Sequence, residues 1–125
     1  MDQRFRKSER LKSKKTIDRL FARNNEEILA LFSYPLKVSA LPGPADALPQ
    51  ILISVSKRHF KRAVDRNLIK RRIREAYRLN KALLTAGGHA PASIALVYVA
   101  KEILSYADIE KKVKVVLRKL GKPEE

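Results

Sequence analysis

The sequence predicts an α+β sandwich, in which a central sheet of three or four strands packs against helices. Three segments carry apolar residues at every third or fourth position, as amphipathic helices do. Between them lie apolar stretches that alternate or run continuously, which is typical of strands, and turn residues separate the two kinds. The resulting order is α-β-β-α-β-α, and 125 residues are enough for a single domain with one core.

The chain begins with a basic arm over residues 1–12, which we expect to be loosely held or to become ordered on contact. A short helix follows over 13–22. Ser13 or Thr16 can cap this helix, and its apolar stripe consists of Ile17, Leu20 and Phe21.

Three segments after this helix are predicted to be extended. Residues 28–41 carry apolar side chains at every second position from Phe32 onward, and Pro35 indicates an edge position or a bulge there. The proline-rich segment 41–49 is a loop, and residues 51–56 alternate as a strand with one strongly apolar face. Residues 94–99 form a continuous apolar run, which predicts a buried strand.

A long basic helix connects the strands at 51–56 and 94–99. We expect a turn at 58–65, a main helix from Arg66, and an end at Ala86-Gly87-Gly88. If the two strands are parallel, this helix is their crossover, which the general rule makes right-handed. The last helix begins at Ser105 or Asp108 and ends at Gly121 and Pro123, with 121–125 as a tail.

Positive charge is concentrated in two parts of the chain. The stretch 57–81 holds eleven Lys or Arg residues and two acidic residues, while 4–23 holds nine and two. On a helix, Asn67, Lys70, Arg71, Arg74, Arg78 and Lys81 fall within an arc of about 100°, opposite an apolar side. Arg72 points toward the apolar flank, where its methylenes can cover the core while its guanidinium stays in water.

The positive charges on such a surface repel one another unless an anion compensates them. The planar guanidinium of arginine suits bidentate contact with phosphate. With a net charge of +15 and a pI of about 10.4, we expect nucleic acid as the partner. The absence of cysteine, of a signal peptide and of any run long enough to span a membrane predicts a cytoplasmic protein without a membrane partner.

No catalytic or metal-binding constellation is evident. His59 and His89 have no companions at catalytic or metal-ligand spacing, so we interpret both as surface residues. Phe21, Phe32 and Tyr34 are more typical of core, although beside Lys37 they could form the floor of a groove for single-stranded nucleic acid. The prediction is therefore no catalytic residue and no metal site in this chain.

The stretch 63–78, AVDRNLIKRRIREAYR, resembles the signature of the bacterial ribonuclease P protein subunit. The similarity extends to ISVSKR at 53–58 and to Arg10-Leu11-Lys12 and Phe21, and so covers almost the full length. The resemblance implies an α-β sandwich with an unusual left-handed βαβ crossover, against the general rule. It also implies an RNA-binding subunit of an endonuclease that removes the 5′ leader of precursor tRNA.

In that family the catalytic RNA and its Mg²⁺ ions perform the chemistry, so the resemblance implies no covalently bound cofactor and no required protein partner. The implied contacts to the catalytic RNA are Lys57, Arg58, Arg62, Arg66, Asn67, Lys70, Arg71, Arg72, Arg74 and Arg78. The implied cleft for the leader consists of Ile17, Phe21, Tyr34 and Lys37.

Two positions depart from the family pattern, and three other functions stay open. Ile17 stands where the cleft often has an aromatic residue, and Phe60-Lys61-Arg62 replaces a turn that often holds glycine. The alternatives are a ribosomal protein, a DNA-binding regulator that reads a major groove with its Arg-rich helix, and a nuclease that works without RNA. Protection of ribosomal RNA, preference for duplex DNA, or cleavage by the protein alone would respectively favour them.

Overall fold

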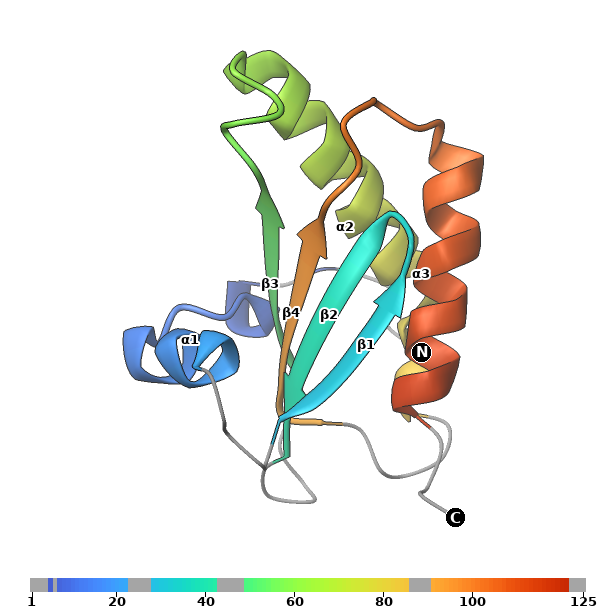
Figure 1. The fold of residues 1–125 in the computed structure, drawn as a ribbon. Helices are drawn as coiled ribbons and strands as arrows, with labels where there is room; N and C mark the ends of the chain where they lie inside the picture. Colours follow the sequence, from blue (N-terminus) through green and yellow to red (C-terminus); the bar gives the residue numbers. More distant parts are fainter. Residues whose placement is uncertain (1–4, 6, 23–27, 43–48, 86–90, 122–125) are drawn as a thin grey trace.

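The computed structural model describes residues 5, 7–22, 28–42, 49–85 and 91–121 of the chain. A mixed sheet forms its centre and has the strand order β1-β2-β4-β3. The strands are β1 (Leu29–Ser33), β2 (Leu36–Leu41), β3 (Gln50–Val55) and β4 (Ser93–Tyr98). β2 pairs antiparallel with both β1 and β4, and β3 pairs parallel with β4 (Figure 1). The predicted α+β class is confirmed, with four strands.

The stretch 28–41 is a hairpin, so the prediction of one extended segment there was wrong. The chain turns at Tyr34 and Pro35, and Phe32 pairs with Lys37. Pro35 sits in the turn, where its missing N–H costs no ladder hydrogen bond, rather than at an edge or a bulge. The strands predicted at 51–56 and 94–99 agree with β3 and β4 to within one residue at each end.

Local signals place the helices close to their predicted bounds. α1 (Lys14–Phe21) is capped by Ser13, whose hydroxyl accepts from the Thr16 N–H, and α3 (Tyr106–Leu120) is capped by Ser105. α2 (Ala63–Thr85) begins three residues earlier than predicted, after a turn at 57–59. Its predicted end at 86–88 lies outside the described residues.

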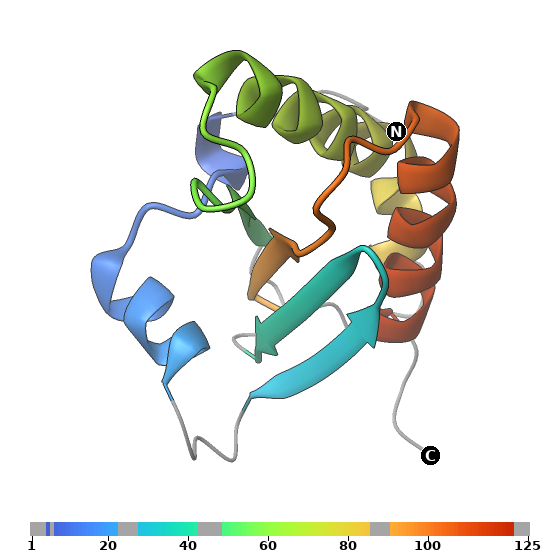
Figure 2. The same ribbon diagram turned by 45° about the horizontal axis from the view of Figure 1, so that its top comes forward.

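α2 and α3 cover one face of the sheet, and α1 lies against the other (Figures 1 and 2). The main core fills the first interface, with Tyr77 from α2, Tyr98 from β4 and Ile109 from α3 almost completely buried. A smaller cluster of Leu11, Leu20, Leu41 and Ala95 holds α1 on the second face. Burial on both faces explains why β4 reads as a continuous apolar run.

The β3-α2-β4 connection is left-handed. In Figure 1 both strands point upward, β4 lies to the right of β3, and α2 passes behind the sheet. Figure 2, with the top turned forward, shows α2 above the strands, as a helix behind them must be. The right-handed crossover expected from the general rule was therefore wrong, and the left-handed one implied by the family resemblance is confirmed.

The described part of the N-terminal segment lies along the β3 edge of the sheet. Arg10 forms an isolated parallel β-bridge with Ile51. The short 3₁₀ helix η1 (Lys7–Glu9) comes directly before Arg10. Phe5 meets Tyr77 edge to face, with ring centroids 5.7 Å apart. Residues 5 and 7–12 are thus packed on the domain, while 1–4, 6 and the tail at 122–125 lie outside the described residues.

Candidate nucleic-acid interface

One side of α2 gathers most of the polar residues predicted to bind RNA. Ile69, Ile73 and Ala76 are buried against the sheet and α3, which turns the opposite side outward. We call this outward side the basic face of α2; it consists of Asn67, Lys70, Arg71, Arg74 and Arg78. Asn67 and Arg71 are exposed, and the other three are partly buried.

A second group of cations surrounds the start of α2. Arg66 donates from Nη1 to the carbonyl oxygens of Phe60, at 2.8 Å, and Lys61, at 2.9 Å. The guanidinium therefore ties the preceding turn to the helix. Lys57, Arg58 and Arg62 are exposed around that turn. Anions are favoured here, since a helix N-terminus carries partial positive charge.

Arg72 does not join the basic face. Its Nη1 donates to the carbonyl oxygen of Leu104, in the segment between β4 and α3. Arg72 thus points toward the apolar flank of the helix, as the helical spacing predicted. Arg72 is predicted to bind RNA as part of the family set, but the structure gives it a bond that fastens α2 to the loop before α3.

Arg74 lies in an unusual environment. Its guanidinium carbon is 5.9 Å from the centre of the Phe5 ring, and that of Arg10 is 5.8 Å from the same ring. The pKa of Arg74 falls below its usual value, first because burial removes water and second because Arg10 is nearby. The guanidinium groups of Arg10 and Arg74 therefore both lie over the Phe5 ring.

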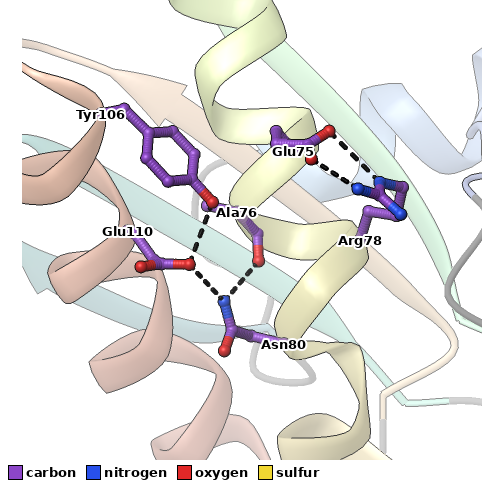
Figure 3. A network of polar contacts seen from close by, with 6 residues as sticks. All are labelled: Glu75, Ala76, Arg78, Asn80, Tyr106 and Glu110. Atoms are coloured by element: carbon purple, nitrogen blue, oxygen red, sulfur yellow. Dashed lines mark hydrogen bonds and ion pairs between the residues drawn. The ribbon is translucent and has the colours of Figure 1, made fainter.

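A polar network fixes α2 against α3 (Figure 3). Glu110 accepts hydrogen bonds from the Asn80 amide, at 3.2 Å, and from the Tyr106 hydroxyl, at 2.9 Å. Asn80 also donates to the carbonyl oxygen of Ala76. Burial, and then the bond to Glu110, raises the pKa of Tyr106 to about 12. These bonds link α2 to α3 in addition to the apolar core that the two helices share.

Close to this network, Arg78 forms an ion pair with Glu75, three residues before it in α2. The hydrogen bond with Arg78 lowers the pKa of Glu75, and the same bond raises the pKa of Arg78. Glu75 is one of the two acidic residues in the basic stretch 57–81, and it offsets one of the cations on the basic face.

The opposite face of the sheet contains a hollow of about 380 Å³ beside α1. It brings together Phe21 and Lys37, two of the four residues predicted for the leader cleft. Phe21 is 51% exposed, so its ring is available for stacking. The other residues that line the hollow are Leu20, Ala22, Ile28, Ala30, Ser39 and Val97.

The other two predicted cleft residues lie elsewhere. Ile17 is partly buried against the cluster beneath α1. Tyr34 borders an adjacent hollow of about 340 Å³, together with Val99, Lys101 and Glu102. The two hollows share no lining residue, so the structure does not bring Tyr34 together with Phe21 and Lys37.

Two further residues of this face, Phe32 and Ser39, were not among the predicted cleft residues. Phe32 was interpreted as more typical of core, with the floor of a groove as the alternative; it is 63% exposed and pairs with Lys37 across the hairpin. Ser39 follows Lys37 by two residues and therefore shares its face. Had the turn at Tyr34–Pro35 been recognised, the alternation along each arm would have placed Phe32, Lys37 and Ser39 together.

Among the described residues, no group of three or more His, Cys, Asp or Glu side chains could hold a metal ion. His59 is exposed, and His89 lies outside the described residues. No described helix is both long and apolar enough to cross a membrane.

The family model for ribonuclease P matches residues 5–121. The chain belongs to the ribonuclease P protein family. It is 38% identical over 110 residues to the ribonuclease P protein component of Porphyromonas gingivalis, covering 84% of this chain and 77% of the relative. With the component of Chlorobaculum tepidum it shares 40% identity over 76 residues, or 51% of this chain and 49% of the relative.

Solved ribonuclease P proteins share the fold. One structure of the Staphylococcus aureus protein superimposes with a TM-score of 0.70 at 24% identity, covering 89% of this chain and 94% of that one. A second gives 0.65 at 20% identity, covering 97% and 98%. The chain is accordingly a protein component of ribonuclease P, associated with the RNA of that ribonuclease complex and acting in tRNA processing.

Proposed function

We propose that this ribonuclease P protein holds the catalytic RNA on the basic face of α2 and on the turn before it. We propose further that the hollow beside α1, lined by Phe21 and Lys37, holds the 5′ leader of precursor tRNA. The observation that carries the proposal is the separation of the two surfaces. Cations gather on α2, while an exposed aromatic ring and a lysine border the hollow on the other face of the sheet. One protein can therefore contact two RNA molecules at once.

Each surface has the chemistry that its proposed ligand requires. The arginines of α2 suit phosphate oxygens and position an RNA, and Asn67 can contact a base edge or a 2′-hydroxyl. In the hollow, the Phe21 ring offers a stacking surface and Lys37 a partner for the backbone of a single strand.

The chain itself supplies no catalytic group in this proposal, which assigns hydrolysis of the phosphodiester to the catalytic RNA and its Mg²⁺ ions. The protein neutralises phosphates, which strengthens assembly and lowers the Mg²⁺ concentration that the RNA needs. We expect this activity in the cytoplasm, with no protein partner required.

The test is cleavage of precursor tRNA by the cognate RNA at low Mg²⁺, with and without the protein. We expect strong stimulation by the protein and no cleavage by the protein alone. Cleavage without RNA would contradict the assignment of catalysis, and a lack of stimulation would contradict the proposed role.

A single substitution tests the basic face of α2 separately. Arg71→Gln should weaken binding to the catalytic RNA and reduce the slope of log K against log salt by about one. The matched control is Lys111→Gln, which removes an exposed cation from α3. Equal RNA binding by the two variants would show that the RNA does not contact this face.

A further inference from the structure

The two edges of the central sheet differ. At one edge the chain covers its own strand β3, because Arg10 forms a parallel bridge with Ile51 and the Leu11 N–H donates to the Ile51 carbonyl at 2.9 Å. At the other edge β1 (Leu29–Ser33) pairs with β2 and with no other described strand, and Figure 2 shows it as the outermost strand. Among the described residues, the sheet therefore has one covered edge and one open edge.

The open edge lacks the features that keep edge strands from pairing with other molecules. β1 has the sequence LALFS, without a charged residue or a proline, and its register with β2 is unbroken, so it contains no bulge. Phe32 is 63% exposed and Leu29 is 39% exposed, although both are large and apolar. In a chain with a net charge of +15, β1 is thus an exposed strand at which another strand meets no charge.

One hydrogen bond in the neighbouring strands shows how the backbone groups of the hairpin are directed. The Val99 N–H donates to the Pro35 carbonyl at 2.8 Å. Because successive residues of a strand direct their backbone groups to opposite sides, Leu36 directs its N–H and C=O toward β1. Leu36 pairs with Ser33, so the groups of Ser33 point toward β2.

The same alternation along β1 directs other groups away from the sheet. Since Ser33 points toward β2, Leu31 does so too, and Ala30 and Phe32 direct their N–H and C=O groups to the open edge. Among the described residues, none donates to or accepts from the backbone of Ala30 or Phe32 at this edge. Both residues are exposed, so water occupies these donors and acceptors.

We propose that β1 pairs antiparallel with β1 of a second copy of this chain, about a twofold axis at Leu31. In this register Ala30 lies opposite Phe32 of the second copy, and a pair of this kind exchanges two hydrogen bonds. The symmetry repeats the pair, so every N–H and C=O group that β1 directs to the open edge gains a partner in both copies. A second copy meets this requirement because it supplies an identical strand.

The side chains of β1 suit the same register. Leu31, which packs against the core shared with α3, lies opposite Leu31 of the second copy. On the other face the two Phe32 rings are diagonal neighbours, within reach of an aromatic contact. No like charges are placed opposite each other, because β1 carries none. Since the β3 edge is covered, the contact closes as a dimer and does not continue into a fibre.

Repulsion between two strongly basic molecules opposes this contact. Each copy carries a net charge of +15, and a strand of five residues gives an interface of the small, weak class. Salt shortens the range of the repulsion but leaves backbone hydrogen bonds and apolar contacts in place. The dimer should therefore become tighter as salt increases, whereas RNA binding becomes weaker.

The primary test is sedimentation equilibrium of the full chain without RNA, at about 1 to 100 μM protein, the range suited to a weak interface. We expect a reversible dimer whose association constant is about tenfold higher in about 1 M NaCl than in about 0.1 M, as the screening length falls from about 10 to about 3 Å. A monomer under all these conditions would overturn the proposal and leave the edge to an extended segment of another protein. Association that weakens with salt would also overturn it.

Two variants with the same change of charge locate the contact. Phe32→Lys places a cation on the open edge, close to its own copy across the axis, and should weaken dimerisation at least about tenfold. Val64→Lys is the matched control, since Val64 is 66% exposed and lies at the start of α2, away from β1. Equal dimerisation by the two variants would overturn the placement of the contact on β1.

Cysteine substitution tests the register directly, because the chain has no cysteine of its own. At the axis the two Leu31 Cα atoms would lie about 4.5 Å apart, a separation that a disulfide spans. The two Ser33 Cα atoms would lie four residues apart along the strands, at about 13 Å. Leu31→Cys should therefore form a covalent dimer on oxidation, and Ser33→Cys should not. Equal linkage of both variants, or none in Leu31→Cys, would overturn this register. These tests contain no RNA, so their outcome is independent of the function proposed above.

Discussion

Arginines that look equivalent in the sequence have different surroundings in the structure. Arg71 projects into solvent, Arg66 bonds to two backbone carbonyls, and Arg72 reaches the loop before α3. Each position along α2 meets a different neighbour, so some of these arginines have a structural role and others are available for the proposed contacts to RNA. Loss of RNA binding after an arginine substitution therefore has to be separated from loss of folding.

Arg66 provides the clearest separation. Arg66→Ala should lower the free energy of unfolding by about 1–3 kcal/mol, because two carbonyls lose a charged donor. Arg66→Lys should recover only part of this, since the lysine side chain is one bond shorter than the path to Nη1, the atom that donates to both carbonyls. Urea denaturation measures the effect, with Arg71→Ala as the exposed control that stays within about 0.5 kcal/mol. Equal stability of Arg66→Ala and Arg71→Ala would contradict a structural role for Arg66.

Tyr106 makes stability depend on pH in the alkaline range. Its pKa is raised to about 12, above that of an unfolded tyrosine near 10. Between these values the unfolded chain loses the proton while the folded chain keeps it, so stability falls as pH rises. The stabilisation is complete below about pH 10 and is lost by about pH 12.

The measurement is the difference in unfolding free energy between the unchanged protein and Tyr106→Phe. At pH 8 we expect the variant to be less stable by about 1 kcal/mol, because it lacks the bond to Glu110. This difference should shrink as pH rises from 10 to 12. A difference that stays constant over that range would mean that Tyr106 does not titrate as described.

At the scale of elements, the close approach of α2 and α3 depends on Gly121. Its backbone is in the right-handed helical region, with φ −85° and ψ −5°, so it is not required by an unusual conformation. A Cβ at this position would lie 2.6 Å from the Leu83 carbonyl oxygen and 2.7 Å from that of Leu84. The glycine therefore does more than end α3, the role that the sequence predicted for it.

Gly121→Ala should force the end of α3 away from α2 and lower stability by about 1–3 kcal/mol. Thermal or urea unfolding measures this, and Lys111→Ala on the exposed side of α3 is the control. If Gly121→Ala matched the control, the two helices would have to adjust at no cost, and the contact would not be limiting.

At the scale of the whole molecule, the sheet separates the two surfaces that we propose to bind different RNAs. A substitution on one surface should leave the other ligand unaffected, because the buried cores of both faces hold the sheet between them. The division predicts that the hollow matters only for substrates with a leader long enough to enter it.

Phe21→Ala should raise the KM of the holoenzyme for precursor tRNA with a long leader by about 5- to 150-fold, as expected from losing one base stack worth about 1–3 kcal/mol. The affinity for the catalytic RNA should not change. A substrate with a one-nucleotide leader is the control. If both substrates are impaired equally, the hollow does not bind the leader.

Much of this protein could be predicted from local sequence. Of the two caps considered for each of these helices, Ser13 caps α1 and Ser105 caps α3. The strands predicted at 51–56 and 94–99 were confirmed to within one residue at each end, and both predictions need only neighbouring residues. Their parallel pairing had been left conditional, and the structure decided it. The basic face of α2 follows from helical spacing alone. The family was indicated by the resemblance of residues 63–78 to the ribonuclease P protein signature, and the family model confirmed it.

The hairpin was not predicted because apolar residues alternate with other residues without a break through its turn at Tyr34 and Pro35. Phe32, Tyr34 and Leu36 read as one face of one strand, but a two-residue turn places Phe32 opposite Lys37 and Leu36 opposite Ser33. This reverses which residues face the core, so Leu36 is buried and Phe32 is exposed.

The sequence by itself therefore determined the helices, the strands that carry clear patterns, the charged face and the family. Only the tertiary structure decided the bond from Arg72 to Leu104, the separation of the cleft residues Phe21 and Tyr34 into two hollows, and the approach of Arg10 and Arg74 to one Phe5 ring. Helical and strand periodicities arise from contacts a few residues apart. These other features join residues that are far apart in the sequence, such as Arg72 and Leu104 or Phe21 and Lys37, where packing geometry rather than local spacing sets the neighbours.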